Sequence, residues 1–410
     1  MRTVQESFVT DKHDRASSPR GETKRPPQQG DGIQPVKKLI ERLIGTLKAF
    51  KLDFWVISGE EVSSGKPLSL LYAGHNAYPE NRAYLRKIAF ANRCSECYLG
   101  KGWRWSRSIR KSTLMHDCSL EMVETPNCSV FRLFQRNPFF IPSWIMGEID
   151  LSAQTILPLH RYSFSFEKKK IAQNQLSYRL STDSEEFDLF YHTMYVPYTR
   201  KVHGEGAVIA SYERLRKQQK NQRMLFILQQ GQAIAGCLIQ YEGRRPHLLY
   251  MGVKDSDSAH IKAGTMGAIY YFGLLSIGSE GYKKAAVGWS RAFLNDGVLL
   301  YKKQRGAVLA ESYAIGFWLK VTRACAGAEA FLKNNPFLFI AEGKYYGALF
   351  IDGGQQLSDQ EFEEIKAKYY MEGMAALIVY PLAPGVKSVP APFTDRIRIG
   401  CTNGWLKKEG

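Results

Sequence analysis

A dense group of polar and charged side chains follows an apolar stretch in the second half of the chain. The apolar residues 285–289 predict a short buried strand. The polar group after it comprises Ser290, Arg291, Asn295, Asp296, Tyr301, Lys302 and Lys303. Loops at strand ends hold functional groups on a fixed scaffold within reach of solvent, so this segment is the first candidate site. Ser290 and Arg291 suit the binding of a phosphate or carboxylate, and Asp296 suits orienting Arg291 or accepting a proton. The alternative is a structural loop with capping hydroxyls and a surface ion pair.

The sequence predicts a helix directly before that strand. Its apolar stripe consists of Met266, Ile269, Tyr270, Leu274 and Ile277. Gly278 and Gly281 are expected to end the helix before the strand begins.

Three short motifs in this region resemble the FemABX-like branch of the GNAT superfamily of acyltransferases, the peptidoglycan-bridge or aminoacyltransferase type. They are Gly281, the Gly-Trp-Ser-Arg segment at 288–291, and the Tyr-Lys-Lys-Gln-Arg-Gly segment at 301–306. The resemblance reaches back to about Ser163. It implies an α+β, tandem GNAT-like fold of mixed sheets with flanking helices, clearer in the second half than in the first. It also implies transfer of an acyl or aminoacyl group to an amine, forming an amide.

The resemblance also suggests roles for individual residues. Lys302 is expected near the reacting carbonyl, where a cation stabilises developing negative charge. His203 is a candidate general base, although a lone histidine before a glycine is often a turn residue. With Asp296, these form the predicted catalytic set. The predicted substrate-binding set is Arg200, Ser290, Arg291, Tyr301 and Lys303, and the predicted donor-binding set is Lys262, Gly264 and Gly267.

The donor region departs from the superfamily pattern. Acetyl-coenzyme A users carry an Arg/Gln-x-x-Gly-x-Gly/Ala signature where strand meets helix, but residues 255–267 read DSDSAHIKAGTMG. This lowers the case for acetyl-coenzyme A and leaves room for another activated donor. We expect acyl-coenzyme A or aminoacyl-tRNA as co-substrate, and no tightly bound cofactor or metal.

The element order upstream agrees with a GNAT fold. Residues 182–185 form a predicted capping box with Thr182 as N-cap, opening a helix at about Ser184 that ends before Pro197. A basic helix at 211–222, an apolar hairpin at 224–241 and a strand at 247–253 follow. A second hairpin at 338–351 echoes the first, and a second capping box at 358–361 opens a helix before a strand at 375–380.

The remaining chain divides by composition. Residues 1–34 predict a disordered basic tail, and the apolar spacing in 36–50 predicts an amphipathic helix that packs on its own domain or lies on a membrane or partner. We predict an N-terminal GNAT-like half at 35–162 and a C-terminal acyltransferase domain at 163–330. Residues 331–381 would complete the fold, and 382–410 would form a surface tail.

Charge and cysteine usage limit the class of protein. The formal net charge of +17 favours an anionic partner such as tRNA, a phosphorylated substrate or an acidic membrane surface. No apolar run is long enough for a membrane span and the start lacks a secretory signal, so we expect a cytoplasmic protein. Seven irregularly spaced cysteines fit reduced thiols. Zinc held by Cys94, Cys97, His116 and Cys118 is a weaker alternative, because His-x-Cys is an unusual second ligand pair.

Two functional hypotheses remain. The first is an acyltransferase acting on a small-molecule or peptide amine. The second is a non-catalytic module on the same scaffold that binds nucleic acid or a membrane surface. The sequence does not fix the oligomeric state.

Overall fold

The computed structural model describes residues 51–401, except for 77, 104–105, 127–138, 153–163, 243–244, 313–314, 355, 384–388, 390–392 and 394. The predicted basic tail and the predicted helix at 36–50 lie outside the described residues.

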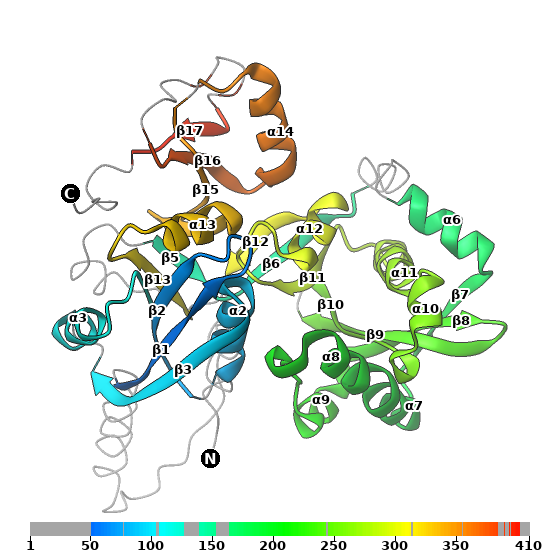
Figure 1. Ribbon diagram of the computed structural model, residues 1–410. Helices are drawn as coiled ribbons and strands as arrows, with labels where there is room; N and C mark the ends of the chain where they lie inside the picture. The colour runs from blue at the N-terminus through cyan, green and yellow to red at the C-terminus, as the bar shows by residue number, and fades with distance from the viewer. Residues whose placement is uncertain are drawn as a thin grey trace, which may run out of the picture. The chain divides into compact units, whose positions relative to one another are not determined.

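The first sheet has six strands in the order β3-β1-β2-β4-β13-β5. Their bounds are Lys51–Glu61 for β1, Pro67–Gly74 for β2, Phe90–Trp103 for β3, Leu120–Pro126 for β4, Phe139–Pro142 for β5 and Ile315–Val321 for β13. Helices α2 (Pro79–Ala89) and α3 (Ser106–Met115) connect the early strands (Figure 1). β2 and β4 are parallel, whereas the other pairs are antiparallel, so the sheet is mixed.

The second sheet has seven strands in the order β12-β6-β11-β10-β9-β8-β7. Their bounds are Ile145–Asp150 for β6, Leu176–Ser181 for β7, Gln222–Gln229 for β8, Gln232–Glu242 for β9, Arg245–Val253 for β10, Lys284–Ser290 for β11 and Val308–Ser312 for β12. Helices α6 (Ser165–Gln173), α10 (Ser258–Lys262) and α11 (Thr265–Ser279) cover one face. The other face carries α7 (Ser184–Leu189), the π-helix η3 (Phe190–Tyr195), α8 (Val196–His203) and α9 (Tyr212–Lys217) (Figure 1). The predicted hairpin, strands and α11 are therefore confirmed.

The two halves exchange strands. β6, from the N-terminal half, lies between β11 and β12, and β13, from the C-terminal half, lies between β4 and β5. The sequence boundary predicted at 162 therefore does not separate the sheets. Each half needs a strand from the other to complete its hydrogen-bonded ladder.

A third, four-stranded sheet follows in the order β14-β15-β16-β17. Its strands are Phe337–Ala341, Lys344–Ile351, Met374–Pro381 and Ile397–Ile399, with α13 (Ala326–Asn334) and α14 (Asp359–Tyr369) beside them. The predicted hairpin and the Ser358 capping box are confirmed. The expectation of a surface tail from 382 onward is wrong for β17, which pairs in parallel with β16.

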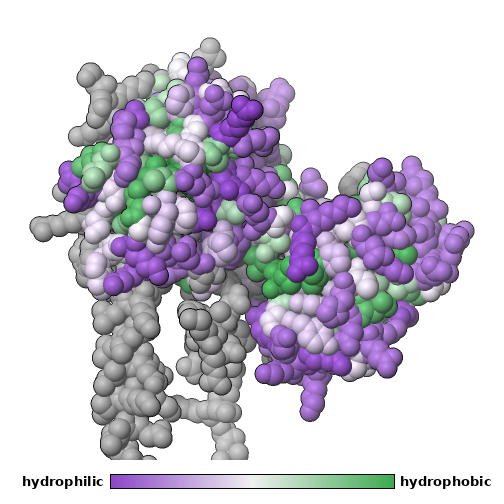
Figure 2. Space-filling view, turned by 60° about the horizontal axis from the view of Figure 1, so that its bottom comes forward, coloured by the Kyte–Doolittle hydropathy of each residue, from purple (hydrophilic) through white to green (hydrophobic). Residues whose placement is uncertain are grey.

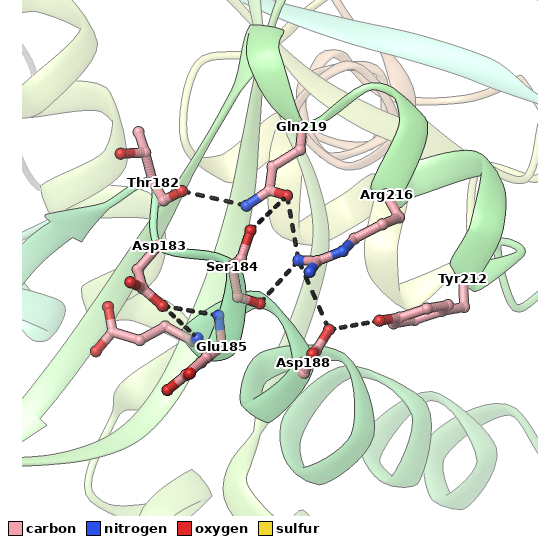
Figure 3. A network of polar contacts seen from close by, with 9 residues as sticks. Thr182, Asp183, Ser184, Glu185, Asp188, Tyr212, Arg216 and Gln219 are labelled. Carbon is pink, nitrogen blue, oxygen red and sulfur yellow. Dashed lines mark hydrogen bonds and ion pairs between the residues drawn. The ribbon is translucent and has the colours of Figure 1, made fainter.

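The helix predicted to end before Pro197 continues through it. α7, η3 and α8 run on without a break, and Pro197 is the second residue of α8, directly after the π-helical turn. The N-cap is Asp183 rather than Thr182, because the Asp183 carboxylate accepts the N–H groups of Glu185 and Glu186 (Figure 3). The predicted helix at 211–222 is also shorter, since β8 begins at Gln222.

One apolar core runs through all three sheets. It includes Leu70 on β2, Leu225 on β8 and Leu377 on β16, all fully buried. Hydrophilic residues cover most of the surface in the view of Figure 2, with smaller hydrophobic areas between them. Among the described residues, no helix is both long and apolar enough to cross a membrane.

Candidate functional site

The neighbouring parallel strands β10 and β11 separate at their carboxyl ends. Only one residue pair, His247 with Ala286, is in register between them. A bulge at Tyr250, with φ of 49°, interrupts β10, and Gly288 takes a φ of 74° at an irregularity in β11. A side chain would be strained at that φ, so glycine suits the position. Here the Gly288 and Trp289 carbonyls of β11 accept hydrogen bonds from the Lys302 side chain.

Lys302 fills this opening from α12 (Gly297–Gln304). Its Nζ donates to the Gly288 carbonyl at 2.8 Å, the Trp289 carbonyl at 2.9 Å and Ser290 Oγ at 2.9 Å. The side chain is only 2% exposed. On β6, a Cβ placed on Gly147 would lie 3.8 Å from Lys302 Cδ, so the exchanged strand forms one wall of the site.

Burial lowers the pKa of Lys302 to about 7, against the opposing attraction of Asp296. Desolvation disfavours a charged amine, and this effect dominates here. The three acceptors around Nζ match the three hydrogens of an ammonium group. A neutral amine can keep the same geometry if the Ser290 hydroxyl donates to it instead. The site therefore accommodates both protonation states near neutral pH.

The structure places Arg291 in a clamp between the two halves. Its guanidinium donates to Asn81 Oδ1 at 2.6 Å and to the Glu80 carbonyl at 3.2 Å, both on α2. It also stacks on Trp144, 3.7 Å from the ring centre, and faces Tyr84 at 4.8 Å. Burial lowers its pKa to about 10. These contacts give Arg291 a structural role, and its predicted role in substrate binding stays a prediction.

Asp296 caps α12. Its Oδ1 accepts the N–H groups of Val298 and Leu299 at 3.0 Å each, and its Oδ2 accepts from the Tyr84 hydroxyl at 3.3 Å. The predicted loop is therefore wrong at this point, because residues 297–304 form a helix; Asp before an apolar Gly-Val-Leu-Leu run is an N-cap signal.

His203 lies at the exposed end of α8. Desolvation of the ring and the positive charge of Lys87 lower its pKa, an effect that Asp296 opposes. His203 and Lys302 are thus both within the electrostatic reach of Asp296. No contact joins His203 to Lys302 among the described residues, and the catalytic roles of Lys302, His203 and Asp296 stay predictions.

A buried ion pair lies at the C-terminal end of α12. Arg305 pairs with Glu167 of α6 and stacks on the Tyr301 ring, 3.2 Å from its centre. Arg305 Nε, Glu167 Oε2 and the Tyr301 hydroxyl are buried with no hydrogen-bond partner in the structure. The buried position of Glu167 could not be predicted from the sequence, because a single acidic residue before three lysines is typical of a solvated helix face.

The predicted donor-binding glycines lie against α6. A Cβ on Gly267 would meet Glu167 Cγ at 2.3 Å, and one on Gly264 would meet Lys170 Cβ at 2.8 Å. Both glycines therefore allow close helix packing. Lys262 is exposed at the end of α10. The donor-binding role of these three residues stays a prediction.

Two other predicted residues lie apart from Lys302. Arg200 is exposed on α8. Lys303 donates to the carbonyls of Ala367 and Lys368 at the end of α14. Burial lowers the pKa of Lys303 to about 8.

The described residues contain no cluster of three or more His, Cys, Asp or Glu side chains placed to hold a metal ion. Cys94 and Cys97 both lie on β3, where residues three apart point to opposite faces of a regular strand.

Comparison with known proteins gives structural neighbours only. No family model matches the chain, and no curated protein matches it. FemX aligns at 10% identity over 64% of this chain and 83% of its own, with a TM-score of 0.33. L-PGS from Bacillus licheniformis aligns at 10% identity over 72% and 93%, with a TM-score of 0.34. A GCN5-related N-acetyltransferase from Sphaerobacter thermophilus aligns at 12% identity over 62% and 71%, with a TM-score of 0.29.

These neighbours include the kinds of protein that the sequence resemblance named. Their low identities and TM-scores assign no function to this chain, so its function is inferred from its own side chains.

Proposed function

We propose that this protein is a GNAT-type N-acyltransferase, which moves an acyl or aminoacyl group from an activated donor to an amine and forms an amide. The observation that carries the proposal is Lys302, a buried amine with a pKa of about 7 at the opening between β10 and β11. A group that gains and loses a proton near neutral pH is suited to general acid–base chemistry.

The reaction needs one proton to leave the acceptor amine and one to reach the leaving group. The amine attacks the donor carbonyl, a C–N bond forms, and the carbonyl oxygen becomes an oxyanion. Neutral Lys302 can take the proton that the attacking nitrogen loses through the Ser290 hydroxyl, which donates its own proton to the amine and accepts the other. The positive charge of the resulting ammonium favours the oxyanion, and the proton returns by the same hydroxyl as the C–O or C–S bond to the leaving group breaks.

Ser290 links Lys302 to this proton movement. Its hydroxyl accepts from the ammonium form and can donate to the neutral form, so the 2.9 Å contact persists through both states. His203, which is exposed at the end of α8, is suited to the same task for an acceptor entering from solvent. No covalent enzyme intermediate is required.

The donor is an acyl thioester or an aminoacyl ester. A thioester releases a thiol, whose ordinary pKa near 8.5 lies close to that of Lys302, and this favours coenzyme A thioesters slightly. The basic composition is equally compatible with tRNA.

The test combines donor binding with turnover. Purified full-length protein is titrated with acetyl-coenzyme A, a long-chain acyl-coenzyme A and charged tRNA, against free coenzyme A and uncharged tRNA, at two salt concentrations. The same donors are then supplied with a panel of amines, and amide formation is followed by mass spectrometry. We expect Lys302→Met to lower kcat at least 100-fold while donor binding persists.

Lys344→Met, at the exposed first residue of β15, is the matched control and should leave turnover unchanged. Equal turnover in the Lys302→Met protein would refute the catalytic role of this amine. Salt-sensitive binding to every polyanion without turnover would favour the binding-module hypothesis.

A further inference from the structure

The helical layer formed by α6, α10 and α11 carries charge of almost one sign. α11 contains no charged residue over Thr265–Ser279. The lysines of the other two helices are Lys168, Lys169, Lys170 and Lys262. The single acidic side chain within the three helices, Glu167, is buried in its ion pair with Arg305. Asp257, the N-cap of α10, lies at the edge of the layer.

Large apolar side chains are exposed on the same layer. Phe166 is 65% exposed, Leu275 41% and Ile261 36%. A helix that is apolar on all sides is normally covered on all sides, yet α11 leaves Leu275 open to solvent. A single exposed leucine needs no explanation, but α6 carries Phe166 together with three lysines and α10 carries Ile261 next to Lys262.

The packing of α6 on α11 keeps these groups on the outside. Lys170 lies at Gly264, Glu167 at Gly267 and Phe164 beside Tyr271, so the two helices run antiparallel. The buried side of α6 therefore packs against α11, and Phe166 and Lys169 on its other side remain exposed. At the far end, the Asn174 side chain donates to the Ala263 carbonyl at 3.1 Å, which joins α6 to the α10–α11 junction. Figure 1 shows the three helices on one side of the second sheet.

We propose that this surface, defined by Phe166, Lys168, Lys169, Ile261, Lys262 and Leu275, docks on an anionic lipid bilayer. Apolar side chains enter the boundary between headgroups and acyl chains, while lysines extend to anionic headgroups. Ile261 and Leu275 are aliphatic and offer no ring for stacking on bases, so the surface suits lipid better than single-stranded nucleic acid. The proposal goes beyond the proposed acyltransferase function and does not depend on it.

The experiment is flotation of the full-length protein with vesicles. One set contains phosphatidylcholine alone and the other equal parts of phosphatidylcholine and phosphatidylglycerol, each at low and high salt. We expect binding to the anionic vesicles that weakens with salt. Lys168→Ala with Lys169→Ala should weaken partitioning about 30-fold, and Phe166→Ser about tenfold.

Matched controls come from the opposite face of the sheet. Lys217→Ala with Lys220→Ala removes the same charge from exposed positions in and just after α9, and Leu189→Ser removes an exposed apolar side chain from α7. These variants should bind vesicles as the unmodified protein does. Circular dichroism and thermal melts verify that every variant is folded.

Several outcomes would overturn the proposal. Equal loss in the control variants would show that net charge, not this surface, drives binding. Equal binding to both vesicle types would exclude a role for anionic headgroups. Binding to a generic RNA with no binding to anionic vesicles would assign the lysines to nucleic acid.

Discussion

Lys302 should make the stability of the protein depend on pH in one direction. Its pKa in the folded state is about 7, whereas an unfolded lysine has the ordinary value of 10.5. Below about pH 7 both states hold the proton, and this residue adds no pH dependence. Between pH 7 and 10.5 the unfolded state binds more protons, so the free energy of unfolding rises with pH. For these two pKa values the rise from pH 7 to pH 9 is about 2.3 kcal/mol.

Urea unfolding of the unmodified protein and of Lys302→Met, measured at pH 6, 7, 8 and 9, isolates this contribution. Every other titrating group, including Lys303, is common to both proteins and cancels in the difference. Between pH 7 and pH 9, the free energy of unfolding of the unmodified protein should therefore rise by about 2.3 kcal/mol more than that of the variant. The difference in the free energy of unfolding between the two proteins should change little between pH 6 and pH 7.

Parallel stability curves for the two proteins would refute the reasoning. They would mean that Lys302 remains an ammonium in the folded state at pH 9, held by its three acceptors. In that case the residue could stabilise an oxyanion but could not accept a proton at neutral pH. The stability measurement needs no substrate, so it tests the chemistry of the amine separately from the identity of the donor.

Two further substitutions test the packing around the site. Arg291→Lys keeps the positive charge but loses the two-pronged contact with Asn81 and Glu80 and the stacking on Trp144. We expect it to lower the free energy of unfolding by about 2–4 kcal/mol. A urea titration that shows a loss of less than about 0.5 kcal/mol would contradict the clamp. Gly267→Ala would press its Cβ against Glu167 and should lower the free energy of unfolding by about 1–3 kcal/mol. Adding Glu167→Ala should restore part of that loss. Strictly additive effects of the two substitutions in thermal melts would show that the two side chains do not collide.

Local patterns predicted most of the second half. The β8–β9 hairpin, β10, α11 and the Ser358 capping box depend on residues close together in the sequence, and periodicity reports such contacts directly. The continuation through Pro197 was missed because a π-helix precedes it, and no periodicity rule signals that change of pitch.

Long-range pairings could not be predicted in the same way. The placement of β6 depends on contacts with β11 and β12, more than a hundred residues later in the chain. Arg291 was recognised as a candidate anion binder from its loop, but its partners on α2 lie about two hundred residues away. Such contacts depend on how the halves assemble, so the sequence indicated residues 290–303 as a candidate site without showing what surrounds them.

The strand exchange explains how both halves contribute to one reactive amine. Gly147 on β6, from the first half, packs against the Lys302 stem, and α2 holds Arg291 just after β11. The contact with Gly147 helps to bury Lys302, and desolvation is the dominant cause of its lowered pKa. The first half therefore acts on the chemistry through burial, even though the amine belongs to the second half. Loosening the contact between the halves would rehydrate the amine and return its pKa toward the ordinary value, so the proposed proton transfer depends on the assembled fold.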